Sequence, residues 1–151
     1  MKKILLSTVL LLVAIAGWAQ TMFTVGDLTY TVTDDEAKTV SVKATSTSIT
    51  GDLVIPSSVT NEEVTYAVTA VGAEGFNGTG ITSVTIPASV MTIGNAAFQN
   101  CGSLASITIE DSETPLTMPG SWYERPFLSP ASTIYIGRNL TLTGEGNNPL
   151  T

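Results

Sequence analysis

The residues of this 151-residue chain that could carry chemistry are few, and histidine is missing altogether. Cys101 is the only thiol. A cysteine nucleophile needs a base that forms its thiolate, so without histidine we interpret Cys101 as a buried structural residue. The lone cysteine also excludes an intrachain disulfide, and the missing histidine excludes imidazole catalysis and histidine-ligated metals. We therefore expect neither an enzyme nor a cofactor.

Carboxylates are the next candidates, because acidic residues gather at positions 34–36, 62–63 and 110–113. Hard cations such as Ca²⁺ prefer oxygen ligands of this kind, and paired carboxylates also serve glycosidases. None of the three segments has the spacing of an EF-hand or of a nonapeptide calcium repeat. We interpret them as solvated turns and predict no metal site.

Two neighbouring aromatic residues, Trp122 and Tyr123, are candidates for binding. Such side chains anchor protein interfaces, and they also stack on sugar rings. The alternative is that they fold back and pack an irregular segment of the chain. The sequence leaves both interpretations open.

The N-terminus has the order of a secretory signal peptide. A basic start at residues 1–3 is followed by an almost wholly apolar run at 4–15 and by the small residues Gly17 and Ala19. The run is shorter than the ~20 residues that span a bilayer. We predict cleavage between Ala19 and Gln20, with an uncleaved N-terminal anchor as the alternative. The product is then secreted or held at the cell surface, without membrane insertion.

Removal of residues 1–19 leaves four basic residues against 13 acidic ones, a net charge of −9. Nucleic acids and anionic lipids need a basic protein surface. We therefore expect no nucleic-acid partner and no binding to anionic membranes.

The rest of the chain is organised by a repeat. Residues 81–86 (ITSVTI) recur 23 residues later as 104–109 (LASITI), and each copy follows a matching block, 71–76 (VGAEGF) and 93–98 (IGNAAF). Similar apolar pairs on either side complete four rungs: Leu53/Ile55, Val84/Ile86, Ile107/Ile109 and Ile134/Ile136. The last residues of successive rungs are 31, 23 and 27 positions apart. The long first interval contains about one extra hairpin strand, at 60–68, and recurrence in this range is typical of leucine-rich repeats.

Residues 86–109, IPASVMTIGNAAFQNCGSLASITI, resemble the BspA-type leucine-rich repeat at nearly every position. The preceding copy matches less completely because of its insertion and because it lacks the family cysteine, with Gly78 or Thr79 near that place. The resemblance implies a β-rich solenoid, a short leucine-rich repeat stack with an N-terminal β cap. We predict a signal peptide at 1–19, the cap at 20–50 and the solenoid at 51–151, with about four rungs and an incomplete last coil.

Each repeat position has a structural role. We expect Ala96, Ala97 and Phe98 to form one short helical or 3₁₀ turn, with Phe98 filling the convex side of its coil. Phe76 and Phe127 occupy the same place in their coils. Gly94 suits a tight bend before the returning segment.

Alternation along the strands predicts which side chains face outward. It sends the rung residues Val84, Ile86, Ile107 and Ile109 inward. The outer face then carries Ser83, Thr85, Ser106, Thr108, Thr133 and Tyr135. In a solenoid such a face is the extended recognition surface. The alternative is that threonine occurs there for its strand propensity alone.

Proteins similar to this one are associated with bacterial adhesion to host matrix proteins and to other cells. The resemblance therefore implies a secreted or cell-surface module that binds an extracellular or host protein through the strand face. One alternative is a carbohydrate-binding or accessory surface protein that uses Trp122, Tyr123 or Tyr135. Another is a non-binding fragment of a longer repeat adhesin. The last coil has no evident polar cap, which predicts self-association through its unpaired strand edge.

Overall fold

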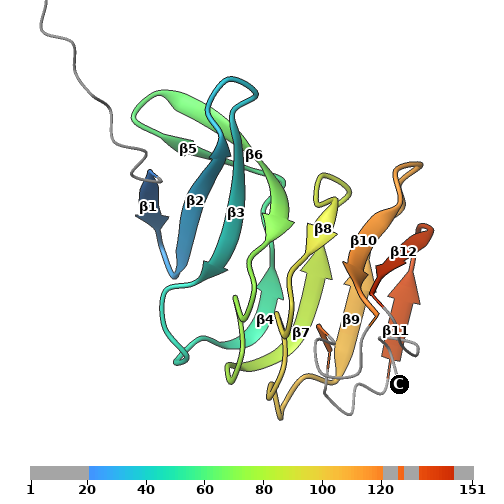
Figure 1. Ribbon diagram of the computed structural model, residues 1–151. Coiled ribbons are helices and arrows are strands. Elements are labelled where there is room, and N and C mark those ends of the chain that lie inside the picture. The colour runs from blue at the N-terminus through green and yellow to red at the C-terminus, as the bar shows by residue number, and fades with distance from the viewer. Residues whose placement is uncertain (1–20, 121–125, 128–132, 145–151) are drawn as a thin grey trace, which may run out of the picture.

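Two β-sheets lie on opposite sides of one apolar core in the computed structural model, which describes residues 21–120, 126–127 and 133–144 (Figure 1). In these residues sheet A runs in the order β1 (Met22–Val25), β2 (Leu28–Asp34), β3 (Thr39–Ala44), β6 (Val64–Val71), β8 (Thr92–Ile93), β10 (Leu116–Pro119) and β12 (Leu140–Thr143). A further strand, β5 (Ser58–Asn61), pairs with β6. Sheet B contains β4 (Thr50–Val54), β7 (Gly80–Ile86), β9 (Ser106–Ile109) and β11 (Thr133–Ile136).

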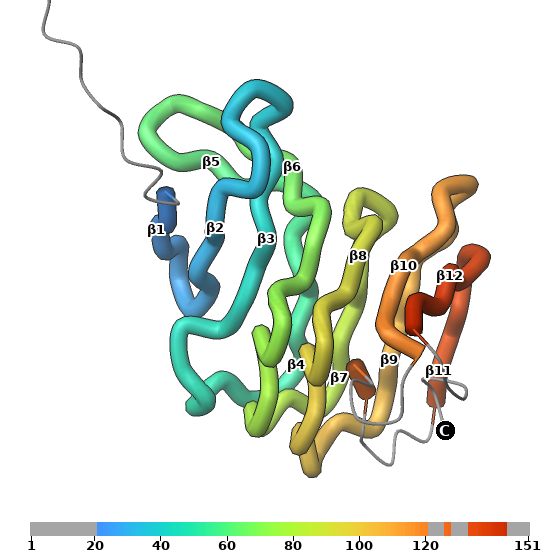
Figure 2. Tube along the Cα trace, viewed as in Figure 1, coloured from blue at the N-terminus to red at the C-terminus, as the bar shows by residue number. Residues whose placement is uncertain are grey.

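The chain winds as a solenoid, passing from a strand of sheet B to a strand of sheet A in each coil. The path of the tube in Figure 2 repeats from β7 to β8, from β9 to β10 and from β11 to β12. The sheet B strands are parallel, and their register aligns Leu53 with Val84, Val84 with Ile107, and Ile107 with Ile134. This register confirms the predicted solenoid and its rungs.

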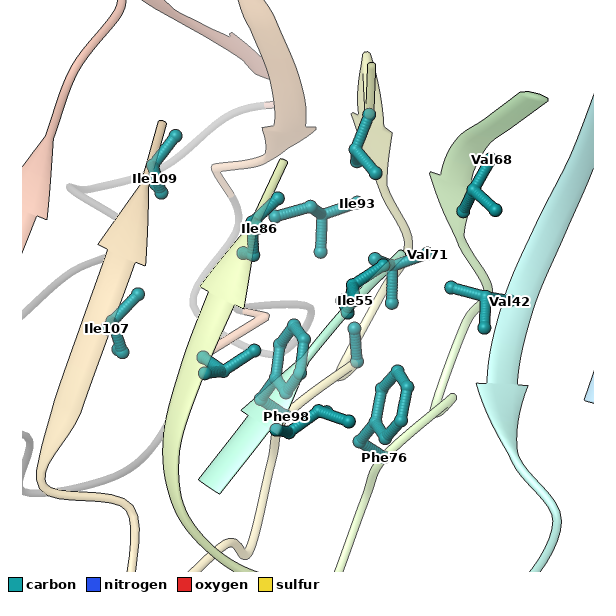
Figure 3. Close-up of a cluster of buried hydrophobic side chains, with 14 of the residues drawn as sticks. Val42, Ile55, Val68, Val71, Phe76, Ile86, Ile93, Phe98, Ile107 and Ile109 are labelled. Atoms are coloured by element: carbon teal, nitrogen blue, oxygen red, sulfur yellow. The ribbon is translucent and has the colours of Figure 1, made fainter. Parts of the chain in front are cut away.

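The core lies between the sheets and is filled by the predicted inward residues. Val84 and Ile107 are each 1% exposed, and Ile86 and Ile109 are fully buried. Figure 3 shows the side chain of Ile86, from sheet B, pointing toward that of Ile93, from sheet A. Burial of one such aliphatic side chain contributes about 1.5–3 kcal/mol to folding.

The connecting turns stack as regularly as the strands. The rings of Phe76 and Phe98 are parallel within 3° at 5.2 Å, and those of Phe98 and Phe127 within 6° at 5.1 Å. This stack confirms that the three phenylalanines occupy equivalent places. The helical turn expected around Phe98 is wrong: the segment forms a turn without a helix, because Ala96 has a left-handed φ of 53° that no α- or 3₁₀-helix accommodates.

Gly94 is required by close approach of the backbone. A Cβ atom at this position would lie 2.5 Å from the backbone nitrogen of Ala73 in the preceding coil. Any side chain would push the two coils apart, so packing between coils requires glycine here, and the turn itself begins at Asn95.

The N-terminal segment extends sheet A beyond the end of sheet B. β2 and β3 form an antiparallel pair within the predicted β-rich segment, and β3 joins the solenoid through parallel pairing with β6. The insertion in the first coil is the expected hairpin, with Val59 opposite Tyr66. Phe23 lies 5.5 Å from the rings of both Tyr30 and Tyr66, which ties these elements together. That this segment acts as a cap stays a prediction.

The predicted signal peptide and its cleavage site lie outside the described residues. In the part of the chain that the structure describes, no helix has the length and apolar character of a membrane span.

Candidate binding surface on sheet B

The predicted outward residues of sheet B form two rows across neighbouring coils. Ser83 is aligned with Ser106, and Ser106 with Thr133. The second row is formed in the same way by Thr85, Thr108 and Tyr135. Such rows arise because parallel strands in register place equivalent side chains about 4.8 Å apart. The structure therefore brings together all six of these predicted residues as one surface, which we call the strand-face strip.

Exposure varies along the strand-face strip. The positions on β7 and β9 are half-buried, because neighbouring strands flank them on both sides. Thr133 and Tyr135, on β11, are exposed, and the Tyr135 side chain is 51% exposed.

Two residues of β4 that were not among the predicted outward residues extend the strip. Asp52 is aligned with Ser83, and Val54 with Thr85. Val54 is 67% exposed, so the second row begins with an apolar side chain and ends with an aromatic one. Alternation around Leu53 would have predicted this outward orientation.

The carboxylate of Asp52 is fixed by two hydroxyl groups of the next coil. Thr82 and Ser83 donate hydrogen bonds of 2.9 and 2.8 Å to Asp52 Oδ1. The bond from Ser83, followed by that from Thr82, lowers the pKa of this carboxyl below its ordinary value, because both bonds stabilise the charged form. Asp52 therefore stays ionised on the strip.

The ring of Tyr135 is fixed in a similar way. Its hydroxyl donates a 2.9 Å hydrogen bond to Asp111 Oδ1. This bond, reinforced by the negative charge of Asp111, raises the pKa of Tyr135 above its ordinary value. The neutral tyrosine thus presents a ring of restricted orientation beside a carboxylate.

Sheet A offers a comparison for the hydroxyl groups. Its outer positions Thr92, Thr117 and Thr141 are also aligned across three strands. Threonine rows on both sheets agree with strand propensity as their cause. What distinguishes the strip is the combination of Val54, Tyr135 and fixed carboxylates with the hydroxyls.

Other predicted candidates are placed apart from the strip. Trp122 and Tyr123 lie outside the described residues. Cys101 is fully buried, and its Sγ lies 3.1 Å from the carbonyl oxygen of Phe76 and 3.4 Å from Thr79 Oγ1. The interpretation of Cys101 as a buried structural residue is confirmed, and Thr79 occupies the equivalent place in the preceding coil.

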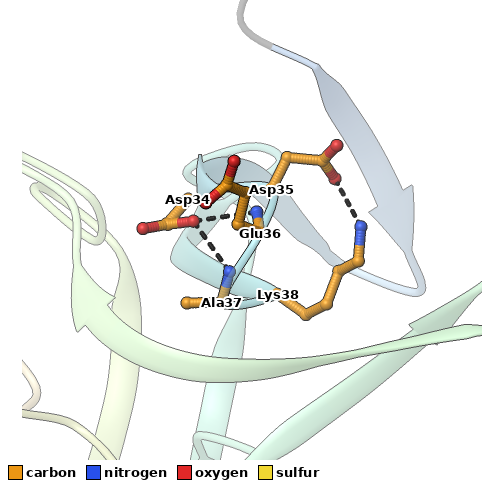
Figure 4. Close-up of polar contacts among 5 residues, drawn as sticks. All are labelled: Asp34, Asp35, Glu36, Ala37 and Lys38. Atoms are coloured by element: carbon orange, nitrogen blue, oxygen red, sulfur yellow. Dashed lines mark hydrogen bonds and ion pairs between the residues drawn. The ribbon is translucent and has the colours of Figure 1, made fainter.

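The acidic segments have local structural roles. Figure 4 shows Asp34 accepting hydrogen bonds from the backbone nitrogens of Glu36 and Ala37, at 2.9 and 2.8 Å, and Asp35 paired with Lys38 at 2.9 Å. These contacts close the exposed turn between β2 and β3. Similarly, Glu110 Oε2 accepts a hydrogen bond from the Ala88 nitrogen.

A buried arginine was not foreseen as an important residue. Arg138 is 7% exposed, and its guanidinium donates hydrogen bonds of 2.7–3.2 Å to four backbone carbonyls, those of Pro87, Ala88, Val90 and Glu110. Burial lowers the pKa of Arg138, and the nearby charge of Glu110 opposes that shift. The acceptors lie up to 51 positions away, so no local sequence pattern could have identified this contact.

The comparisons with known proteins agree with this geometry. Residues 47–119 match the family model described as "BspA type Leucine rich repeat region (6 copies)". The repeat region belongs to the BspA-type leucine-rich repeat family. No curated protein matches the sequence.

Solved bacterial structures share the fold of this chain. A leucine rich cell surface protein from Faecalibacterium prausnitzii A2-165 is 28% identical, with a TM-score of 0.53 over 66% of this chain and 27% of that one. A leucine-rich repeat protein from Bacteroides capillosus is also 28% identical, with a TM-score of 0.51 over 76% and 97%. One from Bacteroides ovatus, at 19% identity, has a TM-score of 0.51 over 78% and 43% and supports the fold alone.

Proposed function

We propose that this chain is an exported surface protein that binds extracellular protein ligands, such as host matrix proteins, through the strand-face strip. The alignment of hydroxyl and aromatic side chains from successive coils into two rows is the observation that carries the proposal. A regular array on a rigid sheet presents its groups at fixed spacing, which reduces the entropy lost on binding. The proposed export rests on the signal-peptide pattern of residues 1–19.

The chemistry of the strip suits a protein surface. Val54 and Tyr135 are the exposed apolar groups at its two ends, and tyrosine is frequent among residues that dominate binding energy. Asp52 and Asp111 add negative charge on the same side. A ligand with exposed basic groups is therefore favoured, since opposite charges steer the encounter. No reaction is proposed.

A charge introduced at the centre of the strip tests this proposal. Thr108→Arg should weaken binding to a panel of immobilised extracellular matrix proteins at least about tenfold, because a long cation interrupts both rows. Thr117→Arg on the outer face of sheet A is the matched control and should leave binding unchanged. Equal binding by the two variants would exclude the strip as the site.

The second candidate function is binding of a glycan at Tyr135. The half-exposed ring, held by its bond to Asp111, favours this candidate because a fixed aromatic face can stack on a sugar. Tyr135→Ala should then abolish signals on a glycan array, while Tyr135→Phe retains the ring and most of the signal. Glycan signals that survive Tyr135→Ala would contradict it.

A further inference from the structure

A groove lies where β1 and β2 meet residues 74–79, the turn of the first coil of the solenoid. No residue of sheet B lines it. Its volume is about 450 Å³, and residues of β1, β2, 43–47 and 74–79 line it. Sites for small ligands commonly have volumes of about 300–1,000 Å³. The side chain of Met22, 56% exposed, supplies an apolar wall.

The groove exists because the turn of the first coil is covered only in part. In the next coil, the carbonyls of Asn95, Ala97 and Gln99 accept hydrogen bonds from nitrogens of the preceding turn, with Gly78 as the donor to Gln99. The Phe76–Phe98 stack makes Asn77 the equivalent of Gln99. Within the described part of the chain, however, no group donates to the Asn77 carbonyl. Asn77 lines the groove, and its carbonyl is an acceptor that the repeat elsewhere pairs with a backbone nitrogen of the neighbouring coil.

Three hydroxyl groups also line the groove, those of Thr24, Thr29 and Thr45. Thr29 Oγ1 lies 3.2 Å from Thr24 Oγ1 and 3.1 Å from Thr45 Oγ1, so two hydrogen bonds join three hydroxyls. Each hydroxyl has one donor and two acceptor positions, which leaves one donor and several lone pairs of this chain unused by the two bonds. The groove therefore both donates and accepts.

Two side chains of opposite charge complete the lining. Lys43 and Glu74 both contribute to the groove, and the described residues contain no ion pair for either of them. Glu74 is exposed in a left-handed conformation with a φ of 53°, the same conformation that Ala96 adopts in the next coil. The repeat therefore determines the backbone conformation at this position. The first coil has the carboxylate of Glu74 there, and the next coil has the methyl group of Ala96.

We propose that this groove binds a neutral mono- or disaccharide. Sugar hydroxyls donate and accept at once, so they can pair with the Asn77 carbonyl, the threonine chain, Lys43 and Glu74. One face of a sugar ring is apolar and fits against Met22. The opposite charges of Lys43 and Glu74 offset each other, so they give no net attraction for an anion or a cation and suit a neutral ligand.

A titration monitored by amide ¹H–¹⁵N spectra tests the site, using glucose, galactose and N-acetylglucosamine as separate probes. At least one sugar should shift the amides of residues 43–47 and 74–79 in a saturable way, with a dissociation constant of about 1 mM. Glu74→Gln and Thr45→Val each change an exposed side chain and should weaken this binding about tenfold. The matched changes Glu36→Gln and Thr60→Val lie outside the groove and should have no effect.

The site would be overturned if none of the three sugars gave saturable shifts, or if both groove variants bound sugar as well as the original protein. It would also be overturned if glycine, which is a zwitterion, bound as well as the best sugar. The outcome is separate from the strand-face proposal: Thr108→Arg should leave the sugar-dependent shifts unchanged.

Discussion

Strands β9 and β11 have the same alternation but differ in burial. Ile107 and Ile109 on β9 are 1% and 0% exposed, whereas Ile134 on β11 is half-buried and Ile136 is 40% exposed. The two strands are aligned residue by residue in sheet B. β9 lies between β7 and β11, while β11 is the last strand of that sheet in the described part of the chain. The side chains of a coil are therefore buried by the coils on either side of it. An isoleucine between two coils contributes more to the free energy of folding than one with a coil on a single side.

The largest expected effect comes from truncating the matched isoleucines. Ile109→Ala should lower the free energy of unfolding by about 2–5 kcal/mol, because it leaves a cavity between two flanking coils. Ile136→Ala should cost about 1 kcal/mol or less, since much of its side chain is already in water. Urea denaturation of the two variants measures both values, and equal losses would show that the number of neighbouring coils does not determine what an isoleucine contributes.

Arg138 provides buried contacts between the last described coil and the interior coils, so its removal should weaken the attachment of that coil. Arg138→Met keeps much of the packing but leaves four carbonyls without their donor, and should cost about 1–3 kcal/mol. Lys38→Met, at an exposed ion pair, is the control and should have a much smaller effect, because water screens such pairs. Similar losses in the two variants, measured by urea denaturation, would show that the buried contacts of Arg138 add nothing.

The apolar groups of the last described coil also predict self-association. Ile136 and Leu142 are 40% and 43% exposed on neighbouring strands of the two sheets. We expect the sedimentation coefficient to rise with protein concentration, and Leu142→Lys to suppress the rise. Met91→Lys, at a similarly exposed residue of an interior coil, is the control. A monomer at every concentration would contradict this expectation.

The smallest expected effect concerns pH. Because its folded-state pKa is lowered, Asp52 contributes stability above the ordinary value of 3.8, and this contribution disappears as pH falls through the folded pKa. Asp52→Asn should therefore be less stable than the original protein near neutral pH and indistinguishable from it at strongly acidic pH. A stability difference that stays constant with pH would rule out the charged form as its cause.

Local periodicity was sufficient to predict the elements that repeat. The apolar alternation around Val84 and Ile107 predicted the sheet B strands, and the matching phenylalanines predicted the stacked turns. The outer strip followed from the same alternation, although its binding role stays a prediction.

Features made by contacts between distant residues could not be predicted in this way. Arg138 meets its carbonyls only after the coils have stacked. Ala96 adopts a left-handed backbone conformation, so the segment forms a turn without a helix. Its residue type could not indicate this, because alanine has the highest helix propensity. The groove depends on how residues 43–47 meet the first turn, which no repeat specifies.

Native-state hydrogen exchange of two equivalent amides tests most directly whether neighbours determine the stability of a coil. The Glu110 nitrogen donates to Ile86 at 3.0 Å, and the Gly137 nitrogen donates to Ile109 at 2.8 Å. If neighbouring coils supply the stability, Glu110 should exchange only through global unfolding and Gly137 through a less costly opening of the last coil. Equal protection of the two amides would mean that the described coils open as one unit. The stability of a coil would then not depend on the number of its neighbours.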